Sequence, residues 1–153
     1  MENINIQLDK IDLQILSFLK RDGRMSFTDI SNEMKASVGM IRNRYQKMVD
    51  NNILHIIGWA DPIKIGIDAY ARVNLKVFPP EKINRVLDQL VALPEVSFVA
   101  LTSGSYNIEI NLMCSNNKQF LSTMMEKIHT IEGVSDSNTT MYLEVKKWAS
   151  RNF

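Results

Sequence analysis

Cysteine is almost absent from this chain, and long apolar runs are absent altogether. Cys114 is the only cysteine in 153 residues, which excludes an intrachain disulfide and fits a reducing compartment. Its neighbours, INLMCS, predict a buried thiol at the end of a strand. The longest apolar stretches fall far short of the roughly 20 residues that a membrane span needs. The N-terminus, MENINIQLDK, lacks the charged and apolar regions of a signal peptide. We therefore expect a cytoplasmic protein with no membrane partner.

A strong net charge is missing as well. The formal net charge is +1, from 18 Lys and Arg against 17 Asp and Glu, so any basic patch that attracts nucleic acid must be local. No metal-ligand cluster, nucleophile–base pair or glycine-rich phosphate loop appears. His55 and His129 form no partner motif with Cys114. These absences argue against an enzyme, and we expect no catalytic residue, no metal and no cofactor.

Three short amphipathic helices are predicted within the first fifty residues. Each apolar repeat at helical spacing follows a good capping residue, namely Asp9, Ser26 or Ser37. Asp12 adds a favourable negative charge to the first helix, which Gly23 ends, and Asp29 forms a weak capping-box pair with Ser26. The expected inward-facing residues are Leu8, Ile11, Ile15, Phe18 and Leu19, then Phe27, Ile30 and Met34, then Ile41, Tyr45, Met48 and Val49.

The third of these helices is basic on one face. Between Met34 and Val49 there are four basic residues and no acidic one, whereas residues 1–61 as a whole hold eight of each. A helix that enters the major groove of DNA needs this asymmetry, because Arg and Lys neutralise phosphates while Arg, Asn and Gln bond base edges. A solvated basic face is the alternative interpretation. The pattern favours a helix-turn-helix that binds double-stranded DNA.

The rest of the chain alternates strands and helices. Residues 53–59 are β-rich and are interpreted as the wing of a winged helix, which ends at Asp61-Pro62. Strands are then expected at 68–77, 96–102, 106–114 and within 134–148, with helices at 81–93 and 117–131. The order β-α-β-β-α-β, with a faint internal repeat at an offset of 38 residues, predicts a ferredoxin-like sandwich. The fold class is therefore α+β.

The predicted sandwich leaves one face of its sheet uncovered. Both helices are expected on the other face, and the strand VSFVAL at 96–101 is apolar on both sides. An apolar open face in a small domain indicates a partner surface. Self-association through the sheets is the simplest interpretation.

Taken together, the motifs make the chain resemble the Lrp/AsnC family of transcription regulators. The resemblance covers nearly the whole chain, and it depends on the order and spacing of short motifs. These are Leu8-Asp9, Asp12, Ile15-Leu16, Asp22-Gly23-Arg24, Ser26, Ile30, Ser37, Ile41, Arg44, Met48, Asp61-Pro62, Gly66, Pro94-Glu95-Val96, Thr102-Ser103-Gly104, Tyr106 and Glu132-Gly133-Val134.

The resemblance implies a division of labour along the chain. Residues 1–61 would form a winged helix-turn-helix, residues 62–67 a linker, and residues 68–153 an effector-binding and oligomerisation domain, often called RAM. The resemblance also implies a dimer that assembles further, commonly into an octamer. Many bind an amino acid between effector domains. A sequence-specific, effector-modulated regulator is the function that this resemblance implies.

The resemblance also assigns residues to the two sites. For DNA they are Arg24, Ser37, Val38, Gly39, Met40, Arg42, Asn43, Arg44 and Lys47. Arg44 matches an arginine of the family that serves either phosphate contact or helix packing. For an effector they are Gly104, Ser105, Tyr106, Asn107, Ser137 and Thr139. Gly104 is expected to permit a tight turn, and the two β-strand hydroxyls at 137 and 139 to face one side.

Position 107 departs from the family pattern. Many members carry aspartate there, where a carboxylate can pair with a ligand ammonium, whereas this chain has Asn107. An amide supplies no charge, and losing a charge-assisted bond costs roughly 1.5–3 kcal/mol, about one to two decades of affinity. Three possibilities stay open: the ligand is not a free α-amino acid, binding is weak, or no ligand is needed.

Three other functions compete with that of a regulator. An architectural protein would compact DNA with little sequence preference, but the mixture of Arg, Asn and Gln on the third helix favours base contacts. Sirohaem decarboxylases resemble this two-domain pattern, so the fold alone does not exclude catalysis. The effector domain offers only His129, Arg72 and Arg85 for such a site. A pure assembly module would leave the basic helix unexplained.

Overall fold

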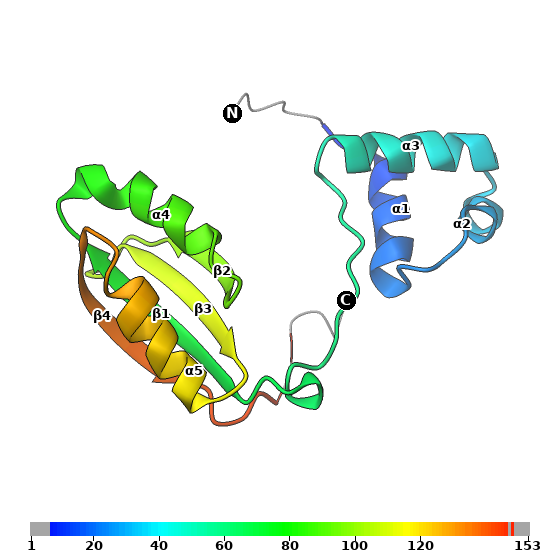
Figure 1. The fold of residues 1–153 in the computed structure, drawn as a ribbon. Coiled ribbons are helices and arrows are strands. Elements are labelled where there is room, and N and C mark those ends of the chain that lie inside the picture. Colours follow the sequence, from blue (N-terminus) through cyan, green and yellow to red (C-terminus); the bar gives the residue numbers. More distant parts are fainter. Residues whose placement is uncertain (1–6, 147, 149–153) are drawn as a thin grey trace. The chain divides into compact units, whose positions relative to one another are not determined.

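The computed structural model describes residues 7–146 and residue 148. The chain divides into two compact units (Figure 1). One unit extends through Trp59 and includes Trp148, and the other begins at Ala60. Within the first unit the ring centroids of Trp59 and Trp148 lie 6.0 Å apart. None of the described helices is long and apolar enough to cross a membrane.

Three helices form the first unit, as the apolar spacing predicts. They are α1 (Lys10–Arg21), α2 (Phe27–Met34) and α3 (Val38–Asp50). Ile15, Ile30 and Ile41 contribute one fully buried side chain from each helix. Leu19, Met48 and Leu54 join them, and the remaining residues of the predicted inward faces are partly buried around this core. The predicted helix faces are therefore confirmed.

The predicted N-terminal caps of these helices are also confirmed. The Asp9 carboxylate accepts hydrogen bonds from the backbone N–H groups of Ile11 and Asp12, each at 2.9 Å. Asp12 reciprocates by accepting from the Asp9 N–H at 3.1 Å, so the two residues close a capping box. Ser26 caps α2 and Ser37 caps α3, each hydroxyl accepting from the N–H three residues on. These bonds satisfy donors that the helices cannot satisfy internally.

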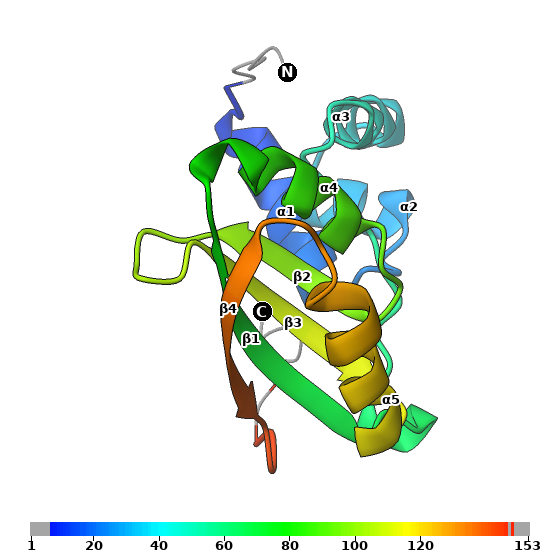
Figure 2. The ribbon, with the colours of Figure 1, turned by 60° about the vertical axis from the view of Figure 1, so that its left-hand side comes forward.

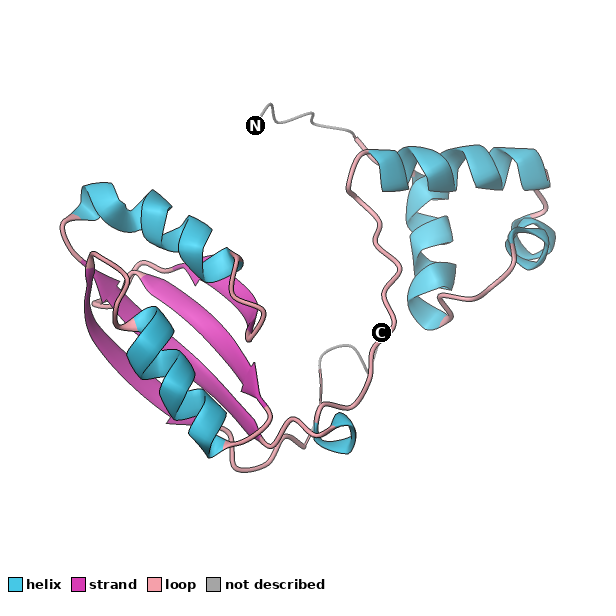
Figure 3. Ribbon diagram, in the orientation of Figure 1, coloured by secondary structure: helices cyan, strands magenta, loops and turns pink. Residues whose placement is uncertain are grey.

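The predicted wing is not a strand. Residues 53–59 have no regular secondary structure, and Figure 3 shows this segment as loop. β-branched residues favour a strand only where a neighbouring strand completes the hydrogen-bond ladder, and the structure pairs no segment with this one among the residues it describes. Ile53 and Leu54 instead pack on the helical core, while Ile56 and Ile57 are exposed.

The second unit is an antiparallel sheet with helices on one face (Figures 1 and 2). Its strands lie in the spatial order β2-β3-β1-β4, so the predicted order of elements and the ferredoxin-like fold are confirmed. The elements are η1 (Ile63–Ile65), β1 (Ala69–Val77), η2 (Pro80–Lys82), α4 (Ile83–Val91), β2 (Val96–Leu101), β3 (Ile108–Cys114), α5 (Asn117–Ser122), η3 (Thr123–Ile128) and β4 (Val134–Met141).

The core of this unit lies between the sheet and its helices. β1 and β3 bury alternate residues, which is the period of a strand with one covered face. Their buried side chains pack with Val86 and Leu90 of α4 and with Met124 and Ile128 of η3. Cys114, the last residue of β3, is 1% exposed, so the predicted buried strand-end thiol is confirmed.

The predicted helix over 117–131 changes its hydrogen-bond register part-way. α5 ends at Ser122, and Thr123–Ile128 continue as a π-helical segment. At its end the His129 N–H donates to the Met124 carbonyl, five residues back, at 2.8 Å. Such π segments are rare and often occur at functional sites. Apolar spacing cannot distinguish the two registers over so short a stretch.

The uncovered face of the sheet is more polar than predicted. Phe98 of β2 is 46% exposed there, as expected from the apolar strand. The central strands differ, because their outward residues are mainly Arg72 and Asn74 on β1 and Glu109 and Asn111 on β3, which pair across the two strands. The period-2 alternation gives these strands one apolar and one polar face. The expectation of an apolar face is thus wrong for its centre.

Candidate functional site

The basic face of α3 is open to solvent. The side chains of Arg42, Asn43 and Lys47 are exposed, whereas Ile41 and Met48 on the opposite side are buried. No acidic residue occurs in the first turn of α3. Arg42 lies with its guanidinium carbon 6.0 Å from the centre of the Phe27 ring, a cation–π contact that orients it. The exposed positive charge is thus carried on a rigid helix.

The turn between α2 and α3 has the short length of a helix-turn-helix. Only residues 35–37 separate the two helices. Lys35 ends α2 in the left-handed conformation, with φ of 50°, and the Ala36 N–H donates to the Ser31 carbonyl at 2.9 Å. Ser37 then starts α3. Val38, Gly39 and Met40 consequently form its first turn, and Arg24 lies exposed in the earlier turn between α1 and α2.

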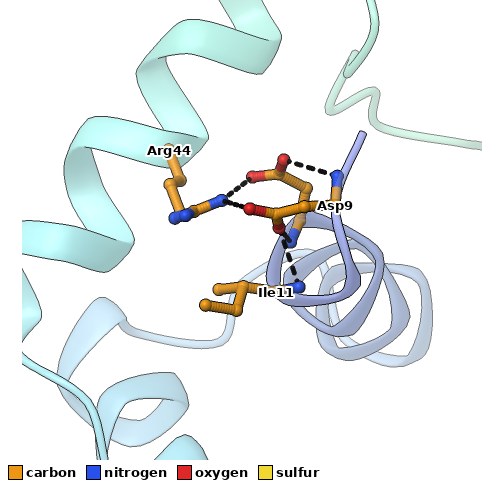
Figure 4. Close-up of polar contacts among 4 residues, drawn as sticks. Asp9, Ile11 and Arg44 are labelled. Carbon is orange, nitrogen blue, oxygen red and sulfur yellow. Dashed lines mark hydrogen bonds and ion pairs between the residues drawn. The ribbon is translucent and has the colours of Figure 1, made fainter. Parts of the chain in front are cut away.

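Arg44 points away from the exposed face of α3 and toward α1 (Figure 4). Its Nη1 donates to Asp9 Oδ2 at 2.7 Å and to Asp12 Oδ1 at 2.8 Å. The hydrogen bond from the Asp12 N–H and then that from Arg44 hold the pKa of Asp9 below its ordinary range. The same two carboxylates raise the pKa of Arg44. Of the two roles considered for Arg44, the structure shows the helix-packing contact.

The turn before β3 is closed by Thr102. Its N–H donates to the Asn107 carbonyl at 3.1 Å, and its hydroxyl donates to the Tyr106 carbonyl at 2.6 Å. Gly104 and Ser105 lie exposed at the tip. A Cβ on Gly104 would meet only the Tyr106 carbonyl oxygen at 3.7 Å, an ordinary contact, and its φ is not positive. Gly104 thus lies in the turn as expected, and nothing in its local geometry demands glycine.

Asn107 uses its side-chain amide within the fold. Its Oδ1 accepts from the Val77 N–H at 2.8 Å, and its Nδ2 donates to the Val77 carbonyl at 2.9 Å. These two bonds extend the pairing of β1 with β3 by one residue. The amide is thereby committed to strand pairing, and Asn107 contributes no charge to a ligand.

Tyr106 connects the turn to the first residues of β4. Its hydroxyl donates to Asp136 Oδ2 at 3.2 Å. Burial, followed by the nearby Asp136 carboxylate, raises the pKa of Tyr106. The next residue, Ser137, has its hydroxyl 2.9 Å from His129 Nε2. His129, Val134, Ser135, Asp136 and Ser137 together line a hollow of about 340 Å³.

The effector residues predicted from the sequence therefore separate into groups. Tyr106 and Ser137 are brought together through Asp136. Ser137 and Thr139 both lie on β4 opposite buried residues of β1, so they face the same side, as expected. That side is the one that the helices cover. Sequence reasoning missed His129, Ser135 and Asp136. His129 lies in the helix predicted over 117–131, and Ser135 and Asp136 directly precede Ser137. None of the three stands in a recognisable motif, because the hollow forms only when η3 and β4 pack together.

Comparison with known proteins bears on both units. Residues 68–150 match the family described as the Lrp/AsnC ligand binding domain. Residues 8–49 match the AsnC-type helix-turn-helix domain. The chain belongs to the Lrp/AsnC family. The resemblance seen in its short motifs is thereby confirmed.

Individual relatives agree with this assignment. An HTH-type transcriptional regulator of Pyrococcus abyssi is 28% identical over 144 residues, which cover 94% of this chain and 90% of the relative. The structure of E. coli AsnC superposes with a TM-score of 0.83 at 23% identity, over 93% of this chain and 96% of that one. An L-Met complex of a Neisseria meningitidis transcriptional regulator gives 0.82 at 18% identity, over 93% and 94%. At these identities the two structural likenesses concern the fold.

Membership of the Lrp/AsnC family makes this protein a transcriptional regulator with a DNA-binding helix-turn-helix and a ligand-binding domain. The comparisons do not favour the alternative of an enzyme similar to the sirohaem decarboxylases, because the family and the named relatives are regulators. Nor do they favour an architectural protein.

Proposed function

We propose that this Lrp/AsnC regulator binds specific DNA sequences by inserting α3 into the major groove. The observation that carries the proposal is the exposure of Arg42, Asn43 and Lys47 on one face of α3 while Arg44 is committed to α1. Lys and Arg on this face would neutralise phosphates, and Arg42 with Asn43 can reach base edges. Ser37, Val38, Gly39 and Met40 supply the N-terminal turn, which approaches the bases in such readers. Arg24 would contact the DNA phosphate backbone beside this turn.

We further propose that a small molecule, such as an amino acid, modulates this binding. The Neisseria meningitidis relative is described in complex with L-Met. In this chain the turn carrying Gly104, Ser105 and Tyr106 is connected to β4 through the bond from the Tyr106 hydroxyl to Asp136, which lines the hollow together with Ser137. Thr139 lies farther along the same strand. Asn107 supports the site from behind by fixing the turn to β1.

Assembly of several copies is the third part of the proposal. On the uncovered sheet face, Arg72 Nε and Asn111 Oδ1 are buried and have no hydrogen-bond partner among the described residues. Buried polar atoms usually have partners, and a second copy could provide them. A dimer, and further assembly to an octamer, would multiply weak half-site contacts through effective concentration. Such a regulator would act in the cytoplasm, where the DNA lies.

We propose that residues 1–61 form the helix-turn-helix domain, residues 62–67 the linker, and residues 68–153 the effector and oligomerisation domain. The match over residues 8–49 falls inside the first of these ranges, and the match over residues 68–150 falls inside the last. η1 occupies part of the proposed linker. Limited proteolysis of the full-length protein tests these limits, and it should cut first between the two folded units.

The experiment that tests the proposal is retardation of DNA from upstream of the protein's own gene, at fixed salt, with and without a panel of amino acids. Retardation of this DNA over unrelated competitor DNA is expected, because specific binding exceeds non-specific binding by about 10³ or more. A change caused by one amino acid would support effector control. Equal retardation of all DNA would contradict sequence-specific recognition, and no retardation would contradict DNA binding.

A further inference from the structure

Phe27 places an aromatic ring against α3. Ser26 caps α2, and Phe27 is the first residue of that helix. The centre of its ring is 5.0 Å from that of Tyr45 on α3, and the two ring planes are 59° apart, a tilted geometry that aromatic pairs favour. Both rings pack on the buried core of the first unit. The position of the Phe27 ring is therefore fixed by packing and does not depend on Arg42.

Arg42 lies over this fixed ring with its hydrogen-bond donors unused. Its guanidinium carbon is 6.0 Å from the centre of the Phe27 ring, and its side chain is exposed. The structure gives Arg42 no hydrogen bond or ion pair with any residue that it describes. All five N–H donors of the guanidinium are thus left for a ligand. The ring reduces the rotamer freedom that a long arginine side chain otherwise loses when it binds.

The other two cations of α3 are placed differently. Arg44 is occupied by Asp9 and Asp12. Lys47 is exposed, and within the described part of the chain neither an acid nor an aromatic ring holds it. A flexible point charge such as Lys47 suits phosphate, whereas a planar fork held in one orientation suits the edge of a base. Arg42 is the cation of α3 that combines a held orientation with free donors.

We propose that Phe27 is a positioning residue for Arg42 and that the pair makes α3 select a guanine in the major groove. The proposal rests on the DNA-binding function proposed above and names the base that is recognised. Guanine presents two acceptors there, N7 and O6, and the arginine fork matches both. Because the ring orients the fork in advance, less ordering is needed when the contact forms. Arg42 also lies in the N-terminal half of α3, the half that approaches the bases in such readers.

The test is retardation, by the full-length protein, of DNA from upstream of the protein's own gene. Methylation of guanine N7 with dimethyl sulfate first identifies the guanines whose major-groove edge the wild type needs. A second fragment then carries 7-deazaguanine at such a position, which replaces the N7 acceptor by a C–H group and keeps the base pair. The affinities for both fragments and for unrelated competitor DNA are measured at one salt concentration.

The variants separate orientation of Arg42 from packing of the core. Phe27→Leu removes the ring but keeps an apolar side chain, and Phe27→Tyr keeps the ring. Phe18→Leu is the matched control, because Phe18 packs on the same core and lies 5.4 Å from the guanidinium carbon of Arg21, but on α1. Arg42→Ala removes the base contact itself. Circular dichroism checks that each variant folds.

We expect Phe27→Leu to bind the upstream fragment about two- to fivefold more weakly, the size of an exposed cation–π contact. Its binding to competitor DNA should not change, since no charge is lost. Phe27→Tyr should bind the upstream fragment more tightly than Phe27→Leu, and Phe18→Leu should bind as the wild type does. The wild type should lose about tenfold in affinity on the 7-deazaguanine fragment, whereas Arg42→Ala should bind the two fragments equally.

Upstream-DNA binding by Phe27→Leu that equals or exceeds that of the wild type would overturn the proposal. So would an equal loss in Phe18→Leu, which would assign the effect to core packing, or an equal loss on upstream and competitor DNA. Wild-type binding that is insensitive to both N7 methylation and 7-deazaguanine would overturn the choice of guanine. No retardation of any DNA by the wild type would instead contradict the DNA-binding function, and this proposal with it.

Discussion

The Asn107 side chain pairs with both backbone polar groups of Val77, accepting from its N–H at 2.8 Å and donating to its carbonyl at 2.9 Å. The amide thus adds two hydrogen bonds to the pairing between β1 and β3. This relationship gives the neutral amide at position 107 a role within the fold.

Replacing Asn107 by aspartate should destabilise the protein. The carboxylate can still accept from the Val77 N–H, but its second oxygen would face the Val77 carbonyl oxygen with no proton between them. The lost hydrogen bond and the repulsion should reduce the free energy of unfolding by about 1–3 kcal/mol at neutral pH. Urea unfolding of Asn107→Asp measures this. Asn84→Asp, on the exposed side of α4, is the control, and equal stability of both variants would refute the strand-pairing role.

Replacing Arg44 by methionine should lower the melting temperature by a few degrees at neutral pH, because it removes the ion pairs to Asp9 and Asp12. The pKa of Asp9 is lowered from its ordinary value of 3.8, so its contribution to stability is present above that pH and is lost as the pH falls through the lowered pKa. The difference in melting temperature between wild type and Arg44→Met should therefore shrink below pH 3.8. A difference that stays constant down to pH 2 would argue for packing alone. Arg24→Met, in an exposed turn, is the control.

Replacing Lys127 by methionine should leave the buried Glu95 carboxylate without its ion-pair partner. Lys127 Nζ lies 2.6 Å from Oε1 of Glu95, whose side chain is 9% exposed, while Glu95 Oε2 is buried without a partner among the described residues. Because Lys127 is itself 42% exposed, solvent screens the pair, and we expect a loss of about 1–2 kcal/mol in unfolding free energy. Glu95→Gln should cost less, since an amide is cheaper to bury than an unpaired charge. Equal losses in the two variants, measured by urea unfolding, would contradict this explanation.

The same pair predicts a pH dependence. The hydrogen bond from Lys127 lowers the pKa of Glu95 from its ordinary value of 4.5. Stability from this group is therefore present above pH 4.5 and is lost as the pH falls through the lowered pKa. In Lys127→Met the buried carboxyl would instead take up a proton more readily. The stability gap between wild type and Lys127→Met should thus narrow below pH 4.5, and Lys118→Met, at an exposed position of α5, should show no such gap.

The helices and the β-α-β-β-α-β order could be predicted because apolar spacing and capping residues are local signals. Asp9, Ser26 and Ser37 cap the helices that they were expected to cap. The prediction of a wing was wrong because strand formation is not a local property. Residues 53–59 have a composition typical of strands, but a strand also needs a neighbouring strand to pair with. The π-helical segment at Thr123–Ile128 likewise had no local signal.

The sites were predictable only where one element carries the chemistry. The exposed positive face of α3 follows from spacing along a single helix. The ion pairs of Arg44 join residues 32 and 35 positions apart, and the Tyr106–Asp136 bond joins residues 30 apart. Such contacts depend on how helices and strands pack. The sequence therefore pointed to Tyr106 and Ser137 through resemblance, but it could not point to the Asp136 that connects them.

The most direct test of DNA recognition by α3 is retardation of the gene's own upstream DNA across a salt series, with Arg42→Ala and Lys47→Ala compared with Lys118→Ala. Circular dichroism should show that all three variants fold. Loss of a phosphate contact should reduce the slope of log affinity against log salt by about 0.9, and loss of a base contact should weaken specific binding by about tenfold. We predict that both α3 variants bind more weakly and that Lys118→Ala binds as wild type does. Retardation by Arg42→Ala and Lys47→Ala that matches wild type at every salt concentration would contradict the assignment of α3 as the recognition helix.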